Sequence, residues 1–205
     1  MRVVLASAND GKLREMRALL EAVGLALVAQ ASLGVERADE TGASFRDNAL
    51  IKARHAARRS GLPALADDSG LEVDALHGEP GVHSARYAGA TATDAQNLAK
   101  LLAELRDVPD ERRSARYRCS IAFVRSRDDA APLLAEGAWE GRIGRSPRGS
   151  GGFGYDPIFI PAGLDATAAE LDPEVKNSLS HRGQALRSLH SQLTAWMHDM
   201  KGRRA

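Results

Sequence analysis

Apolar stretches with the length of β-strands alternate along this chain with stretches of helical spacing. A short buried strand is predicted at residues 3–6, and apolar residues recur at helical spacing over 13–20. Two further strands are predicted at 116–124 and 132–139, joined by a turn. Strands and helices mixed in this way predict an α/β fold. A length of 205 residues suits one domain over residues 1–205, built as two closely packed lobes.

Three other helices have clearer boundaries in the sequence. Ser44 and Asp47 fit a capping box at the start of a helix, and Gly61, followed by a leucine and a proline, ends it. The next helix is predicted to begin near Thr93, with leucines at i, i+3, i+4 and i+7. The last helix is predicted from about Ser178, with one apolar stripe, and we expect the final few residues to be frayed.

Charge and composition exclude several classes of partner. Lys and Arg total 28 against 27 Asp and Glu, so a formal charge of +1 predicts no nucleic-acid partner, which requires a strongly basic face. The apolar run at the N-terminus is too short for a signal peptide, and no later run approaches a membrane span. We therefore expect a cytoplasmic protein with no membrane partner. The single cysteine, Cys119, lies in a predicted strand and is interpreted as a structural thiol.

Four polar clusters interrupt this scaffold, and the first is Ser7-Ala8-Asn9-Asp10-Gly11-Lys12. A hydroxyl, an amide, a glycine turn and a lysine at the start of a helix indicate a phosphate cradle. The glycine spacing differs from a Walker A loop. An ordinary helix-capping turn is the alternative.

The second cluster, Asp67-Asp68-Ser69-Gly70, follows the apolar segment Ala64-Leu65-Ala66 directly. Adjacent carboxylates on an extended chain point in opposite directions, so one of the two is expected to face a site. A carboxylate at the end of a strand can hold Mg²⁺ or act as a general base. A solvated turn is the alternative.

Glu40 is the third acidic feature and precedes the helix that carries Lys52. It contributes to a site only if the fold brings it near Asp68, because Mg²⁺ usually takes one or two carboxylates together with phosphate oxygens. Lys52 taken alone is more often a surface lysine than a ligand.

The fourth cluster is the glycine-rich loop from Gly149 to Asp156. Glycines allow the backbone to approach a ligand closely, and Phe153 and Tyr155 offer planar faces for a base. A flexible hairpin connection is the alternative. Further cations, Lys176, His181 and Arg182, gather at the start of the last helix. They suit a phosphate or a base carbonyl, whereas solvated charges at a helix end are the more common outcome.

Seven segments in order resemble the inosine triphosphate pyrophosphatases, over nearly the whole chain from Val3 to about Leu189. The segments are Ser7-x-Asn9-x-x-Lys12, Glu40-Thr41-Gly42, Asn48-Ala49-x-x-Lys52-Ala53, Ala66-Asp67-Asp68-Ser69-Gly70-Leu71, Pro80-Gly81-x-x-Ser84-Ala85-Arg86-Tyr87, Gly151-Gly152-Phe153-Gly154-Tyr155-Asp156-Pro157-x-Phe159 and Ser180-His181-Arg182-Gly183. Ser7 stands where many members have threonine, which keeps the hydroxyl.

The resemblance implies an elongated, two-lobed α/β fold around a long twisted mixed sheet, with flanking helices, a central nucleotide cleft and a homodimer. It also implies a role for each matched residue. The triphosphate is held by Ser7, Asn9, Lys12 and Lys52, and Ser69 is a further substrate contact. Asp68 is the catalytic residue and positions Mg²⁺ together with Glu40. Phe153 stacks on the purine beside Gly154, Tyr155 and Asp156, and the base and its neighbouring groups are met by Lys176, His181 and Arg182.

The implied reaction is the hydrolysis of ITP, dITP or XTP to the monophosphate and pyrophosphate, which cleanses the nucleotide pool. Asp68 activates or orients a water that attacks the α-phosphorus. Donors such as His181 or Arg182 meet the 6-oxo group of the base, and adenine lacks that group. Two alternatives stay open: a Maf-like pyrophosphatase with another base preference, and a non-catalytic nucleotide-binding module.

Overall fold

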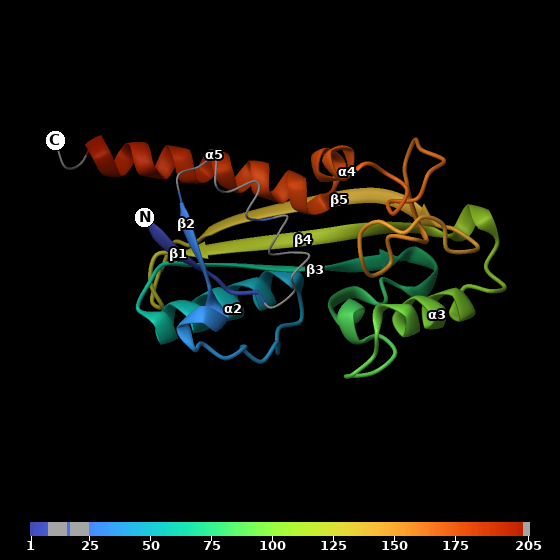
Figure 1. The fold of residues 1–205 in the computed structure, drawn as a ribbon, viewed down its shortest axis with the longest axis horizontal. Helices are drawn as coiled ribbons and strands as arrows, with labels where there is room; N and C mark the ends of the chain where they lie inside the picture. The colour runs from blue at the N-terminus through green and yellow to red at the C-terminus, as the bar shows by residue number, and fades with distance from the viewer. Residues whose placement is uncertain (8–15, 17–24, 203–205) are drawn as a thin grey trace. The chain divides into compact units, whose positions relative to one another are not determined.

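The computed structural model describes residues 1–7, 16 and 25–202. Its sheet has six strands in the order β2-β1-β3-β4-β5-β6 (Figure 1). The strands are β1 (Arg2–Leu5), β2 (Ala26–Ala29), β3 (Ala64–Val73), β4 (Ser114–Val124), β5 (Leu133–Ile143) and β6 (Phe159–Pro161). β1 runs parallel to β2 and β3, whereas β5 and β6 are antiparallel, so the sheet is mixed. The α/β prediction is therefore confirmed.

The described α-helices are α2 (Phe45–Ser60), α3 (Asp94–Glu104), α4 (Pro173–Leu179) and α5 (His181–Gly202). The predicted helix at 13–20 lies outside the described residues except for Met16, which is helical and buried. The single last helix predicted from Ser178 is instead two helices. Ser180 has an extended backbone that separates α4 from α5, and Asp172 with Pro173 starts α4 earlier than expected. Among the described residues, no helix is long and apolar enough to span a membrane.

The predicted starts of α2 and α3 are correct, with one difference in their capping. The Ser44 hydroxyl accepts from the Asp47 amide at 3.1 Å, and Gly61 caps the other end of α2 in the left-handed region. The Ser44 hydroxyl also donates to the Asp47 carboxylate at 2.7 Å. The reciprocal capping box is found at Thr93 and Gln96, at the start of α3.

The chain divides into two compact units. The first comprises residues 1–68, 119–137 and 182–205, and the second comprises 69–118 and 138–181. Strands β3, β4 and β5 each contribute residues to both units.

In the first unit, α2 and α5 cover opposite faces of the sheet (Figure 1). Alternate residues of each strand face opposite sides. Leu65 packs in the cluster that contains Leu186 and Leu189 of α5, whereas Ala64 and Ala66 pack against the alanines of α2. Cys119 is buried in the α5 cluster, as expected for a structural thiol.

The second unit has its own core, in which Leu101 and Leu105 at the end of α3 pack with residues of β3, β4 and β5. Arg113, only 2% exposed, lies at the edge of this core. Its guanidinium donates to the backbone carbonyls of Leu105 at 2.6 Å, Ile143 at 2.9 Å and Gly144 at 2.9 Å. This side chain joins the end of α3 to the end of β5.

Strand β3 differs from its prediction in length. It was expected to end at Ala66, with Asp67 and Asp68 beyond the strand, yet it continues to Val73. Both aspartates are therefore inside a strand, 1% and 6% exposed. Hydrophobic patterning ended the strand too early because two acidic residues interrupt its apolar run. β2 and β6, of four and three residues, were not predicted, and β5 extends four residues beyond its expected end.

Candidate functional site

The first unit contains a cluster in which Lys52 contacts two carboxylates. The Lys52 ammonium donates to Glu40 Oε1 at 2.9 Å and to Asp68 Oδ1 at 2.8 Å. The side chains of Lys52 and Asp68 are 14% and 8% exposed. Glu40 thus lies near Asp68, as its predicted role requires. We call Glu40, Asn48, Lys52 and Asp68 the carboxylate–lysine cluster.

Asn48 completes this cluster and received no role from the sequence. Its amide group donates to Asp68 Oδ2 at 3.2 Å, and its Oδ1 accepts from the Gly42 amide at 2.8 Å. A Cβ at Gly42 would lie 2.7 Å from Asn48 Oδ1, so only glycine fits there. Asn48 and Lys52 are four residues apart on α2 and therefore lie on one side of the helix. That spacing was the available signal for Asn48.

The electrostatics of the cluster keep Lys52 protonated. Burial by itself lowers the pKa of an ammonium group. The nearby carboxylates of Asp68, Asp67 and Glu40 outweigh this effect and raise the pKa of Lys52 above its ordinary value. A permanent positive charge is therefore held against Asp68.

Asp67 and Asp68 point in opposite directions, as their positions on one strand require. Asp68 lies on the side of α2, whereas Asp67 Oδ2 lies 3.5 Å from the Arg182 Nε of α5. The Arg182 side chain is 3% exposed in this ion pair. Asp67 is thus the counter-charge of a buried arginine, and Arg182 is engaged inside the first unit.

The second unit contains a cluster centred on Asp156. Asp156 Oδ2 accepts from Lys176 Nζ at 2.8 Å and from the Phe153 amide at 2.8 Å, while Oδ1 accepts from the Tyr117 hydroxyl at 3.1 Å. The Lys176 ammonium lies 5.2 Å from the centroid of the Phe153 ring. The structure therefore brings together three predicted residues: Phe153, Asp156 and Lys176. We call these, with Tyr117, the Asp156 cluster.

Tyr117 is a member that sequence reasoning missed. Its ring stacks on that of His181, with centroids 4.7 Å apart and planes 9° apart. Its position in a buried strand was interpreted as a core position. A buried tyrosine usually has a hydrogen-bond partner for its hydroxyl, which was the available signal. Tyr117 links His181 to Asp156.

The glycine-rich loop approaches the protein itself closely. A Cβ at Gly149 or Gly151 would lie within 3 Å of the Ala169 backbone, and one at Gly152 would collide with the Asp156 carboxylate. These glycines thus have a steric requirement within the protein itself, and the close approach of a ligand to the loop stays a prediction. Gly154 has space around it, and its amide donates to Asp94 at 2.8 Å.

The two aromatic residues of the loop have different surroundings. Phe153 is half-buried, whereas Tyr155 is 4% exposed and packs in the core of the second unit. The Tyr155 hydroxyl donates to the Ser84 carbonyl at 2.8 Å, and burial raises the pKa of Tyr155. The prediction that Tyr155 offers a face to a base is therefore wrong, because its ring is enclosed.

The remaining predicted residues are placed as follows. Ser7 is half-buried after β1, in the first unit, and Ser69 is half-buried in β3, in the second. Asn9 and Lys12 lie outside the described residues. Within the part of the chain that the structure describes, no group of three or more His, Cys, Asp or Glu side chains could hold a metal ion. Of the predicted metal ligands, the structure offers the two carboxylates of Glu40 and Asp68.

These features define an α/β protein with a buried carboxylate–lysine cluster and an aromatic glycine loop. A model of the Ham1 family matches residues 3–192. The chain is 61% identical to a dITP/XTP pyrophosphatase of Methylococcus capsulatus, over 95% of this chain and 96% of that protein. It superposes on a HAM1 protein of Coxiella burnetii with a TM-score of 0.89 and 52% identity, covering 95% and 99% of the two chains. It also superposes on a nucleoside-triphosphatase / dITP/XTP pyrophosphatase of Mycobacterium abscessus with a TM-score of 0.75 and 50% sequence identity, covering 92% of this chain and 97% of that one. The chain belongs to the Ham1 family.

Proposed function

We propose that this protein hydrolyses non-standard purine nucleoside triphosphates, namely ITP, dITP and XTP, to the monophosphate and pyrophosphate. The observation that carries the proposal is similarity: relatives named dITP/XTP pyrophosphatase are 61% and 56% identical to it over 95% and 92% of the chain. The buried lysine beside an oriented carboxylate supports the same chemistry, because phosphoryl transfer depends on positioning and on neutralising charge.

The catalytic group in this proposal is the Asp68 carboxylate. Asn48 and Lys52 each hold one of its oxygens, at 3.2 Å and 2.8 Å, so its orientation is fixed. In that orientation Asp68 accepts a proton from the water that attacks the α-phosphorus, or orients that water. Lys52, which stays protonated, neutralises charge on the leaving pyrophosphate.

We propose Mg²⁺ as the cofactor, held by Glu40 and Asp68. Two carboxylates within 3 Å of one ammonium fit a hard divalent cation, because Mg²⁺ takes one or two carboxylates and completes its shell with phosphate oxygens. When bound, the metal supplies further positive charge against the triphosphate. Ser7, Asn9 and Lys12 are proposed as triphosphate contacts, with Ser69 as a further substrate contact.

Base recognition is assigned to the Asp156 cluster. Phe153 offers the half-buried ring for stacking, and Gly154 and Tyr155 support it. His181, held flat against Tyr117, donates to the 6-oxo group, and Lys176 lies beside the ring of Phe153. Adenine has an amino group at that position and would leave the donor unpaired, a mismatch that costs a factor on the order of 10⁴. Arg182 contributes by orienting the start of α5 through Asp67.

The test is Mg²⁺-dependent pyrophosphate release from ITP, XTP, ATP, GTP and dTTP, measured side by side. We expect release from ITP and XTP, lowered by about 100-fold or more in Asp68→Asn because a general base contributes that much. Asp47→Asn, in the first turn of the same helix as Lys52, is the matched control and should retain activity. Equal release from all five would disprove the base assignment, and preference for dTTP would favour a Maf-like enzyme. Nucleotide binding without turnover would indicate a binding module.

We further propose that the protein is a cytoplasmic homodimer. The resemblance to the pyrophosphatase family supports the dimer, and the absence of a membrane-spanning helix among the described residues is consistent with that location. Sedimentation equilibrium would measure the mass directly against the 21.9 kDa of one chain.

A further inference from the structure

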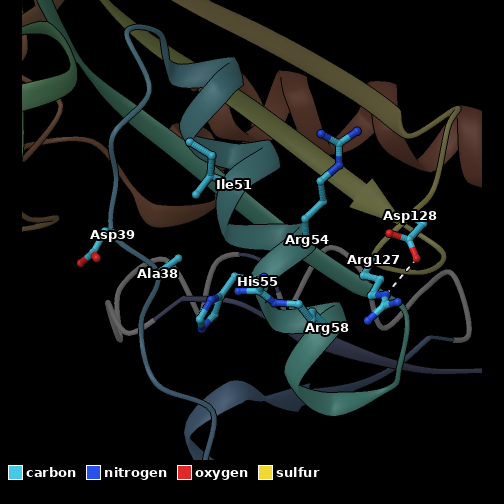
Figure 2. Close-up of a pocket in the computed structure, with 8 residues that line it drawn as sticks. All are labelled: Ala38, Asp39, Ile51, Arg54, His55, Arg58, Arg127 and Asp128. Carbon is cyan, nitrogen blue, oxygen red and sulfur yellow. Dashed lines mark hydrogen bonds and ion pairs between the residues drawn. The ribbon is translucent and has the colours of Figure 1, made fainter.

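A groove with basic residues crosses the outer side of α2, away from the alanines that this helix buries (Figure 2). Its volume is about 570 Å³, within the usual range for small-molecule sites. Its walls come from residues 38–39, from α2, and from residues 127–128 between β4 and β5. All of these belong to the first unit, and none is a member of the carboxylate–lysine cluster.

The three arginines that line the groove outnumber its two carboxylates, Asp39 and Asp128. Arg54 and Arg58 lie one helical turn apart on α2 and both line the groove, with their guanidinium groups pointing in different directions (Figure 2). Within the described part of the chain, no carboxylate oxygen lies close enough, at 4.0 Å or less, to form an ion pair with the guanidinium of either residue. The third arginine, Arg127, is already paired with Asp128 at 2.8 Å. Like charges at i and i+4 on a helix repel, so a bound anion would reduce the repulsion between the two guanidinium groups.

The polar walls also identify the kind of anion. A guanidinium presents a planar fork of donors that matches a phosphate group. The apolar part of the lining is Ala38 and Ile51, and the lining also includes the imidazole ring of His55. His55 donates from Nε2 to the Glu36 carbonyl at 3.1 Å, which holds the 36–39 segment along the helix. The guanidinium donors of the groove therefore favour a phosphate group as its ligand.

We propose that this groove is a second anion site, which binds inorganic phosphate or pyrophosphate through Arg54 and Arg58. The site is separate from the proposed catalytic cluster and does not depend on the proposed activity. Pyrophosphate carries more negative charge than orthophosphate, so we expect it to bind more tightly beside these two arginines.

The experiment is a titration of ¹⁵N-labelled protein with pyrophosphate at constant ionic strength, followed by NMR. We expect saturable shifts of the Arg54 and Arg58 Nε–Hε signals and of the Ala38 amide. The variant R54Q/R58Q should weaken the Ala38 response by about tenfold or more, because each charged hydrogen bond contributes substantially. Both arginines are exposed, so the variant should fold, and R58Q alone is a milder second variant.

R59Q is the matched control, since Arg59 is an exposed neighbour on α2 that does not line the groove. Orthophosphate and sulfate arms distinguish two linked phosphates from single anions. Shifts that rise linearly without saturating, or equal weakening in R59Q, would overturn the proposal. Saturation by a glutamate-rich peptide but not by pyrophosphate would also overturn it, in favour of an acidic protein partner. Activity assayed on the same samples separates this result from that of the proposed function.

Discussion

At the scale of single residues, most of the candidate chemistry depends on how each carboxylate is held. Asp68 is held by an amide and an ammonium, and Asp156 by an ammonium, a backbone amide and a hydroxyl. Each aspartate is therefore fixed in one rotamer, which is how a protein holds a functional group in a productive geometry.

Tyr117 is the residue for which the structure adds most to the sequence. In Tyr117→Phe the stack on His181 remains, but the hydrogen bond to Asp156 is lost. We expect a KM for ITP raised about 10-fold, because a hydrogen bond to a charged group contributes about 1.5–3 kcal/mol, with kcat little changed. Steady-state kinetics measures both.

Tyr87→Phe is the matched control, since the Tyr87 hydroxyl contacts Glu104 in the same unit and no member of the Asp156 cluster. A KM unchanged in Tyr117→Phe, or raised equally in Tyr87→Phe, would contradict a positioning role.

At the scale of elements, Arg113 determines how α3 and β5 meet. Burial lowers the pKa of this guanidinium, and the neighbouring Arg145 lowers it further, yet the pKa of an arginine is too high for it to lose its charge. Its donors satisfy carbonyls at the end of α3, where a positive charge also suits the helix dipole.

Replacing Arg113 with methionine would remove the donor to the Ile143 and Gly144 carbonyls, whereas the Leu105 carbonyl keeps the Val108 amide at 3.1 Å. Each buried polar group left unsatisfied costs about 1–3 kcal/mol, so we expect a loss of about 2 kcal/mol or more in the free energy of unfolding. Urea denaturation measures this loss. Arg112→Met, at an exposed neighbour, should change stability by less than about 0.5 kcal/mol, and a similar loss in both variants would refute the role of Arg113.

At the scale of the whole molecule, part of the loss of stability in acid can be traced to Asp129 in the β4–β5 connection. Burial raises the pKa of this carboxyl, but hydrogen bonds from Arg125 outweigh it and lower the pKa from 3.8 to about 2. A depressed folded pKa stabilises the protein above pH 3.8, and this contribution is lost as the pH falls towards 2.

Asp129→Asn should therefore destabilise the protein at pH 7, by roughly 1 kcal/mol given that Arg125 is partly exposed to solvent. The difference between variant and wild type should shrink as the pH falls from about 4 to about 2. Thermal unfolding across this pH range measures it. Asp128→Asn, at the exposed neighbour, is the control, and a difference that stays constant with pH would contradict the assignment to Asp129.

The sequence predicted the elements whose signals are local. Thr93 and Gln96 start α3 within the same turn, and Gly61 ends α2, so caps and spacing were sufficient. Tyr117 and Asp156 are 39 residues apart, and no local pattern shows such a partner. Strand β3 was predicted too short because its aspartates are stabilised by Lys52 and Arg182, which come from two helices. The resemblance placed Glu40 near Asp68, which composition and spacing left open.

The alternation of Asp67 and Asp68 along β3 makes the length of this strand more critical than its side chains. A single residue inserted between Ala64 and Asp67 reverses the facing of both aspartates, so that Lys52 loses the Asp68 carboxylate and Arg182 loses its counter-charge together. Over evolutionary time, this strand is therefore expected neither to gain nor to lose residues.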